Sequence, residues 1–151
     1  MEIHYKLQLY RDGDECEDVT GGWAKIAGYG KATETAYNTG STLYVEARGN
    51  NAGDGAIARI GTVNQIDLTG YSRLNVKVDS SSISGSGQSV KILKGSIVLE
   101  NICINSTTSF SGIKSVDLSD YQETDTIVIQ CYSGPSTSKY GKISVSQIWL
   151  D

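Results

Sequence analysis

A short phrase occurs twice in this sequence, and an alternating apolar and polar segment follows each copy. The first copy covers residues 66–71 (IDLTGY) and leads into residues 74–78, and the second covers residues 116–121 (VDLSDY) and leads into residues 126–130. Asp, Ser and Thr side chains close tight turns by bonding to nearby backbone groups. Alternation with a period of two is typical of a strand with one buried face. Each copy therefore predicts a corner between two strands of a β-sandwich.

The remaining sequence predicts further short strands, and no stretch sustains a helical period. Alternating or apolar segments occupy residues 3–10, 23–27, 43–47, 56–68, 90–93, 97–104, 113–118 and 143–150, with a looser one at 31–37. The last segment changes phase near Ser146 and Gln147, which predicts a β-bulge. We expect an all-β fold, a single β-sandwich or jelly roll of about eight to ten strands.

The connections between these strands are rich in Gly, Ser, Asn and Asp. Residues 49–55 consist almost entirely of turn formers and are expected to form the most mobile exposed loop. The Ser/Gly tract at 79–89 predicts a flexible hairpin connection, and residues 105–112 predict a polar loop. Residues 56–68 form either one strand or two strands broken at Gly61.

Length and charge limit the classes of function. The 151 residues suit one domain over 1–151, which we expect to be part of a larger protein or assembly. The net charge is −4 without a basic cluster, which argues against nucleic acid as the partner. No apolar run reaches the roughly 18 residues of a membrane-spanning helix, and the first residues lack a secretory signal. We expect a cytoplasmic chain, one exported by another route, or a piece of a longer protein.

The cysteines and the histidine offer little chemistry. Cys16, Cys103 and Cys131 form no C-x-x-C pair, which excludes a zinc ribbon or a redox motif. Cys103 and Cys131 have the pattern of small buried hydrophobes, and a bridge between them requires neighbouring strands. His4 is the only histidine, so any Ser-His-Asp or Cys-His unit would depend on this strand residue.

Further enzyme signatures are also missing. No G-x-S-x-G, G-x-G-x-x-G or phosphate-binding loop motif occurs. A glycosidase pair could come from any two of Glu34, Glu46, Glu100 and Glu123, but sequence cannot measure their separation, and dispersed surface acids are the default interpretation. We expect a chain without catalytic activity.

Aromatic and amide side chains suggest a glycan-binding surface. Sugar rings stack on exposed aromatic planes, while amides and carboxylates bind the hydroxyls. The predicted ligand-binding residues lie in or beside loops: Tyr29, Tyr37, Asn50, Asn51, Asp54, Tyr132 and Tyr140. Tyrosine also covers strand edges, which is the alternative interpretation. Trp23 and Trp149 are expected in the core, and Tyr71 and Tyr121 in the repeated corners.

An acidic stretch suggests a metal site. Residues 12–18 contain five carboxylates, the oxygen ligands that Ca²⁺ prefers. The stretch fails as an EF-hand because its sixth position after Asp12 is Glu17 instead of Gly. A solvated acidic turn is the alternative.

Several short phrases together resemble known modules. Residues 14–16 (DEC), 18–23 (DVTGGW), the phrase at 66–71 and the closing pattern of 143–150 resemble modules at the distal ends of tail or minor structural proteins of Firmicutes prophages. The pattern is also similar to the galactose-binding-like jelly rolls of carbohydrate-binding modules. In those jelly rolls a late strand packs beside the N-terminal strand.

The resemblance implies a role and a set of partners. It implies a non-catalytic carbohydrate-binding or adhesion module that attaches to a cell-surface glycan, or a structural virion domain that contacts another tail protein. Such a chain would be cytoplasmic during assembly and virion-associated afterwards. The jelly rolls often hold a structural Ca²⁺ between an early acidic turn and the last strand, which implies Asp12, Asp14, Glu17 and Asp151 as ligands.

Overall fold

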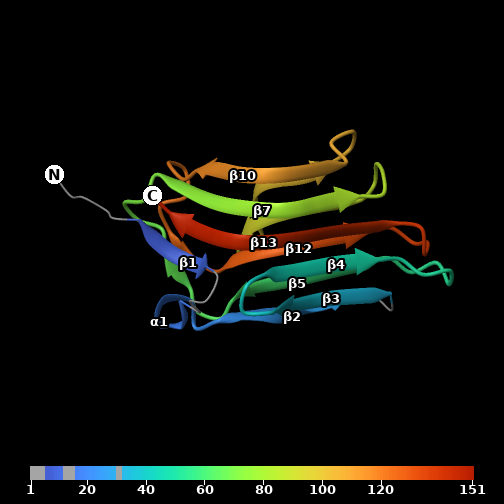
Figure 1. The fold of residues 1–151 in the computed structure, drawn as a ribbon, viewed down its shortest axis with the longest axis horizontal. Coiled ribbons are helices and arrows are strands. Elements are labelled where there is room, and N and C mark those ends of the chain that lie inside the picture. The colour runs from blue at the N-terminus through green and yellow to red at the C-terminus, as the bar shows by residue number, and fades with distance from the viewer. Residues whose placement is uncertain (1–5, 12–15, 30–31) are drawn as a thin grey trace.

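Two antiparallel β-sheets face each other in the computed structural model, which describes residues 6–11, 16–29 and 32–151 (Figure 1). The β13 sheet, named after its central strand, has the order β10 (Ser109–Asp117), β7 (Arg73–Ile83), β13 (Tyr140–Leu150), β4 (Leu43–Arg48) and β3 (Thr33–Asn38), and β1 (Leu7–Arg11) also pairs with β13. The β12 sheet has the order β2 (Trp23–Tyr29), β5 (Ala56–Thr62), β12 (Ile127–Ser133), β8 (Ser89–Lys94) and β9 (Ile97–Ile104). The predicted all-β jelly-roll sandwich is confirmed.

Two smaller elements complete the described chain. The strands β6 (Ile66–Asp67) and β11 (Thr124–Asp125) form a pair of their own, and α1 (Glu17–Thr20) is a single helical turn. Among the residues that the structure describes, no helix is long and apolar enough to span a membrane.

The core lies between the two sheets and follows from alternation along the strands. On β4, Leu43, Val45 and Ala47 are fully buried, while the residues between them remain partly exposed. On β12, Ile127 and Ile129 point into the same core. Burying one such aliphatic side chain contributes about 1.5–3 kcal/mol, so this one-sided pattern on both sheets stabilises the sandwich.

The two copies of the repeated phrase form matching corners. The Asp67 Oδ1 accepts a hydrogen bond from the Thr69 backbone nitrogen at 2.9 Å, and the Asp117 Oδ1 accepts one from the Ser119 nitrogen at 2.8 Å. The corners also bind each other, because the Gln122 side chain accepts from the Gly70 nitrogen at 2.8 Å and donates to the carbonyls of Tyr71 and Leu118. The predicted corners are confirmed, and they lie side by side.

Three predicted connections turn out differently. The strand β7 continues to Ile83, because Ser80 and Ser81 pair with β13 and the Ser81 Oγ donates to the Lys142 carbonyl at 3.1 Å. Part of the tract expected to be a flexible hairpin is therefore a strand. Similarly, β10 begins at Ser109, inside the expected polar loop. Residues 56–68 break after Thr62, and not at Gly61, which lies within β5. The predicted bulge on the last strand is confirmed between Val145 and Gln147.

The loop at 49–55 is held by hydrogen bonds at both ends. The Asn50 Oδ1 accepts from the backbone nitrogens of Ala52 and Asp54, both at 3.0 Å. The Gly49 nitrogen donates to the Ser133 Oγ at 3.1 Å and to the Lys139 carbonyl at 3.2 Å. The loop that we expected to be the most mobile is thus tied to the β12–β13 connection.

Cys103 and Cys131 are buried and free. Both lie opposite Val90, one on each side of β8, so their strands are not neighbours. Two strand spacings separate their Cα atoms by roughly 9.5 Å, beyond the roughly 7 Å that a disulfide bridges. Burial raises the pKa of both thiols. A bridge between them is excluded.

Replacing Gly49 by Ala should destabilise the sandwich by about 1–3 kcal/mol and lower Tm by about 2–10 °C. An added Cβ would collide with the Gly134 carbonyl oxygen and lie 2.5 Å from the Ser136 nitrogen, both on backbone that cannot move independently. Gly85→Ala is the matched control, since no atom lies within 4 Å of its Cβ position. Thermal melting of both variants measures the effect, and equal melting temperatures would contradict it.

Asp117→Asn should lower Tm near neutral pH and lose this effect in acid. Hydrogen bonds from Ser119 hold the pKa of Asp117 below its ordinary value of 3.8. The ionised carboxylate therefore stabilises the fold above that value, and this contribution disappears as pH falls through the lowered pKa. Melting curves of both proteins over this range should converge at the acid end. A difference in Tm that is independent of pH would show that the charge plays no part.

Candidate functional site

The outer face of the β13 sheet carries a cluster of aromatic and charged side chains. Alternation on β4 directs Tyr44, Glu46 and Arg48 outward, because the residues between them point into the core. Directly opposite residues of antiparallel strands share a face. The register therefore adds Tyr37 from β3, and Tyr140 and Lys142 from β13. We call the whole set the tyrosine patch: Tyr37, Tyr44, Glu46, Arg48, Tyr140 and Lys142.

A chain of contacts holds the centre of the tyrosine patch. The rings of Tyr37 and Tyr44 lie 5.3 Å apart at an interplanar angle of 32°. The Tyr44 hydroxyl donates to the Glu46 Oε1 at 2.9 Å, and the Glu46 Oε2 lies 3.7 Å from the Arg48 Nε. Burial, followed by the hydrogen bond to Glu46, raises the pKa of Tyr44 to about 12. The neutral phenol is therefore held in one orientation.

The two outer tyrosines of the patch differ in their surroundings. The Arg48 guanidinium carbon lies 5.0 Å from the centre of the Tyr140 ring, and the Lys142 Nζ lies 5.1 Å from it. Both contacts are cation–π interactions, which occupy part of that ring. Tyr37 is 48% exposed. Within the tyrosine patch, Tyr37 thus offers the more accessible aromatic surface.

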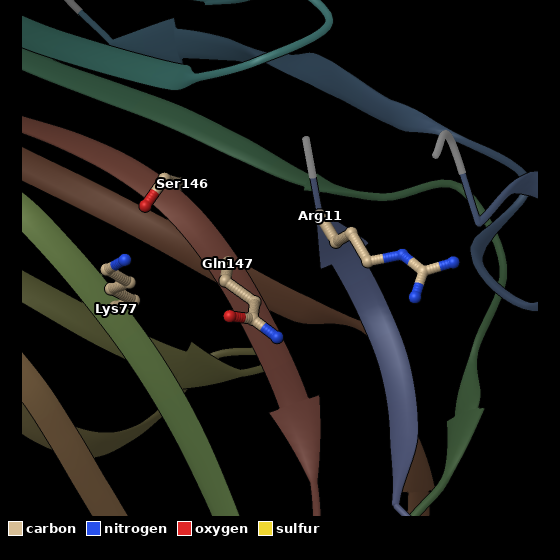
Figure 2. Close-up of a pocket in the computed structure, with 4 residues that line it drawn as sticks. All are labelled: Arg11, Lys77, Ser146 and Gln147. Carbon is tan, nitrogen blue, oxygen red and sulfur yellow. The ribbon is translucent and has the colours of Figure 1, made fainter. Parts of the chain in front are cut away.

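A pocket of about 270 Å³ lies on the same face, where β1, β13 and β7 meet (Figure 2). Its lining comes from Arg11, Lys77, Ser146 and Gln147, and Figure 2 shows Gln147 between Lys77 and Arg11. The bulge on β13 places two consecutive residues at the pocket, whereas a regular strand would turn one of them inward. The Gln147 Nε2 donates to the Gln8 Oε1 at 2.9 Å, which orients its amide.

Trp149 continues this face beyond the pocket. Its register partners, Gln8 and Asn75, place it on the outer face, where it is half-buried. The Lys6 Nζ lies 4.5 Å from its ring. Placing Trp149 in the core was therefore wrong, whereas Trp23 is buried as predicted and donates from Nε1 to the Leu9 carbonyl at 2.9 Å.

Comparison with known proteins identifies the fold. No protein-family model matches the chain, and no curated protein matches it. Among solved structures, a family 27 carbohydrate-binding module of Caldicellulosiruptor saccharolyticus, in complex with mannohexaose, superposes with a TM-score of 0.56 at 13% identity, over 98% of this chain and 97% of that one. The family 11 carbohydrate-binding module of a Clostridium thermocellum cellulosomal cellulase gives 0.50 at 14% identity, over 99% and 95%. The chain has the fold of these carbohydrate-binding modules.

The predicted ligand-binding residues lie in separate places on this jelly roll. Tyr37 and Tyr140 belong to the tyrosine patch. Tyr132 lies on the outer face of the other sheet and is 38% exposed, and Tyr29 ends β2, with its side chain outside the described part of the structure. The sequence therefore identified two residues of the patch.

The three predicted loop residues lie at one end of the sandwich. The Asn50 amide nitrogen donates to the Asp54 Oδ2 at 3.1 Å, so these two side chains close their own loop. The Asn51 Oδ1 accepts from the Thr137 hydroxyl at 3.1 Å. These polar groups hold the loops together, and their predicted role in ligand binding stays a prediction.

The predicted calcium ligands are only partly described. Asp12 and Asp14 lie outside the described residues, as does the side chain of Glu17. As expected, β1 and β13 are neighbours, but Arg11 pairs with Gln147, so the acidic stretch begins at the opposite end of β1 from Asp151. The Asp151 Oδ2 instead accepts from the Asn75 amide at 2.9 Å and lies 3.9 Å from an Arg73 nitrogen.

No further metal site is visible. Nowhere in the described ranges do three acidic, histidine or cysteine side chains form a group that could hold an ion. The calcium site therefore stays a prediction.

The alternation of residues 43–48 could have predicted the patch residues that were not named from the sequence. Its outward positions, Tyr44, Glu46 and Arg48, follow from the same alternation that identified the strand. The pocket could not be predicted in this way, because it depends on which strands lie beside β13.

Tyr44→Phe should reduce the loss of stability in alkali. The unfolded protein releases the tyrosine proton near pH 10.0, whereas the folded protein keeps it until about pH 12. The contribution of Tyr44 is therefore complete below pH 10.0 and disappears as pH rises through about 12. Melting temperatures over this range should fall more steeply for the unmodified protein than for the variant. Parallel curves would contradict the shifted pKa.

Proposed function

We propose that the protein is a non-catalytic carbohydrate-binding module whose ligand lies across the outer face of the β13 sheet. The observation that carries this proposal is the tyrosine patch, where the exposed ring of Tyr37 lies next to Tyr44, which is hydrogen-bonded to Glu46, the ion-pair partner of Arg48. An aromatic plane binds the apolar face of a sugar ring, and neighbouring charged and amide groups bind its hydroxyls.

The rigidity of the patch favours binding. Its side chains project from paired strands, and their mutual contacts restrict their rotamers before any ligand arrives. Binding then costs less conformational entropy than it would on a mobile loop. The resemblance of the fold to two carbohydrate-binding modules, one of them in complex with mannohexaose, supports the same proposal.

The carboxylates support a role without catalysis. Glycoside hydrolysis needs two carboxyl groups that face each other across the scissile bond. The Glu46 carboxylate is bonded to Tyr44 and Arg48, and Glu123 contacts the buried Lys94 at 3.2 Å. Glu34 and Glu100 lie on β3 and β9, which belong to different sheets.

The biological setting is a finer part of the proposal. The resemblance of the sequence phrases to prophage tail modules suggests adhesion of a virion to a bacterial surface glycan, with a neighbouring tail protein as the second partner. A structural Ca²⁺ at the acidic stretch belongs to the same proposal. The virion setting follows from the sequence resemblance, and the ion also from the five carboxylates of residues 12–18.

A structural or protein-interaction domain is the second candidate. Three apolar side chains are exposed on two strands at the ends of their sheets: Ile97 at 48% and Val98 at 39% on β9, and Ile113 at 56% on β10. Edge strands with apolar side chains favour association. A stable symmetric contact would bury more than about 1,000 Å², and light scattering would then report an oligomer.

Tyr37→Ala should weaken glycan binding about threefold to tenfold and change Tm by less than about 2 °C, because the ring is half-exposed. Tyr132→Ala is the matched control, since it removes a similarly exposed tyrosine from the outer face of the other sheet. A glycan array identifies the ligand, and titration calorimetry compares the three proteins. Equal losses for both variants, or no glycan bound at all, would contradict the proposal.

A further inference from the structure

Cationic side chains gather on the face that carries the tyrosine patch and the pocket. Arg48 and Lys142 flank Tyr140, and Arg11 and Lys77 line the pocket. The whole chain has a net charge of −4, so this gathering does not follow from composition. Five acidic residues instead lie at the two corners and their β6–β11 pair: Asp67, Asp117, Asp120, Glu123 and Asp125.

Two carboxylates of the described residues lie near these cations, and both have partners. Glu46 bonds to Tyr44 and Arg48, and the Asp79 Oδ1 accepts from the Ser146 hydroxyl at 2.8 Å. Asp79 therefore lies close to the pocket and anchors one of its lining residues. The four residues that line the pocket include two cations, one amide and one hydroxyl, and no carboxylate.

The arrangement of Lys77 suits an oxyanion. Lys77 is exposed and lies directly opposite Gln147, which in turn lies opposite Arg11 on the other edge of β13. Three neighbouring strands thus line one pocket, and Figure 2 shows the Lys77 ammonium on one side of the Gln147 amide, whereas the Arg11 guanidinium on the other side points away from both. Ammonium and guanidinium groups form their strongest hydrogen bonds with ionised oxygens, as in carboxylates and phosphates.

We propose that the glycan ligand is acidic and that its carboxylate or phosphate group occupies the pocket, bound by Lys77 beside the Gln147 amide. This inference rests on the proposed function and specifies the ligand class of the same face. A sugar stacked on Tyr37 and an oxyanion in the pocket would belong to one chain that runs along β13. A uronic acid polymer and a phosphodiester-linked polymer supply the same oxyanion chemistry.

The test compares polymers that differ in charge. Polygalacturonate carries a carboxylate on each sugar, its fully methyl-esterified form has the same backbone without charge, and a phosphodiester-linked hexose polymer carries a phosphate at each linkage. Titration calorimetry of the full chain should show binding to an anionic polymer at least about tenfold tighter than to the methyl ester, with affinity falling as salt rises. The anionic polymer that binds identifies the source of the oxyanion.

Variants locate the charge that matters. Lys77→Gln should weaken binding to the anionic polymer about threefold to tenfold, whereas Lys77→Arg should retain most of it. Lys91→Gln is the matched control, because it removes one lysine charge from the outer face of the β12 sheet and should change affinity less than about twofold. Melting temperatures confirm that all three variants fold.

The outcomes distinguish failure of the acidic-ligand inference from failure of the proposed carbohydrate-binding function. If the methyl ester or another neutral glycan binds equally tightly, or if Lys77→Gln acts no more than Lys91→Gln, the acidic ligand is ruled out. Binding of a neutral glycan that still depends on Tyr37 would overturn this inference and leave the proposed function in place. If no polysaccharide binds, both fall.

Discussion

The pairing of β13 determines most of what this protein presents on its surface. One edge of β13 pairs with β7 over its whole length, whereas the other edge pairs first with β4, from Tyr140 to Val145, and then with β1, from Gln147 to Leu150. The bulge falls at this change of partner. The first residue of β4, Leu43, and the last residue of β1, Arg11, lie at this point, and Ser146 and Gln147 line the pocket beside them. The tyrosine patch and the pocket therefore both depend on the pairing of β13 with its neighbouring strands.

The two Asp-Leu corners lie where the chain passes from one sheet to the other. Each copy uses an aspartate to bond a backbone nitrogen two residues later, and this leaves Leu68 and Leu118 fully buried. Gln122 then joins the corners by two hydrogen bonds, to Gly70 and Tyr71, and makes a third to Leu118 of its own corner. Side chains that bond neighbouring backbone groups make such turns local in sequence and rigid in space. Two of the acidic residues at this end, Asp67 and Asp117, are thus part of the turns themselves.

The sequence predicted those features that depend on neighbouring residues. Strands with one buried face, the corners and the bulge near Ser146 all follow from local patterns, and the structure confirms them. Strand partners depend on contacts between distant residues, so the separation of Cys103 from Cys131 by β8 was beyond local reasoning. For the same reason, the candidate ligand-binding residues were predicted to lie in or beside loops. Tyr37 and Tyr132 were grouped because both were expected in or beside loops, yet they lie on the outer faces of different sheets.

Side chains on a strand are also more restricted in their rotamers than side chains on a loop. On a loop, a tyrosine and an arginine must lose rotamer freedom when a ligand binds, at about 0.5–1.5 kcal/mol for each side chain. On β4, Tyr44, Glu46 and Arg48 have already lost much of this freedom to one another. The Asn50 and Asp54 side chains differ from these residues, because their hydrogen bonds close their own loop. Polar side chains on β4 thus lie on the outer face of the sheet, whereas those in this loop hold the loop together, and this difference supports the proposal that the ligand binds to the sheet.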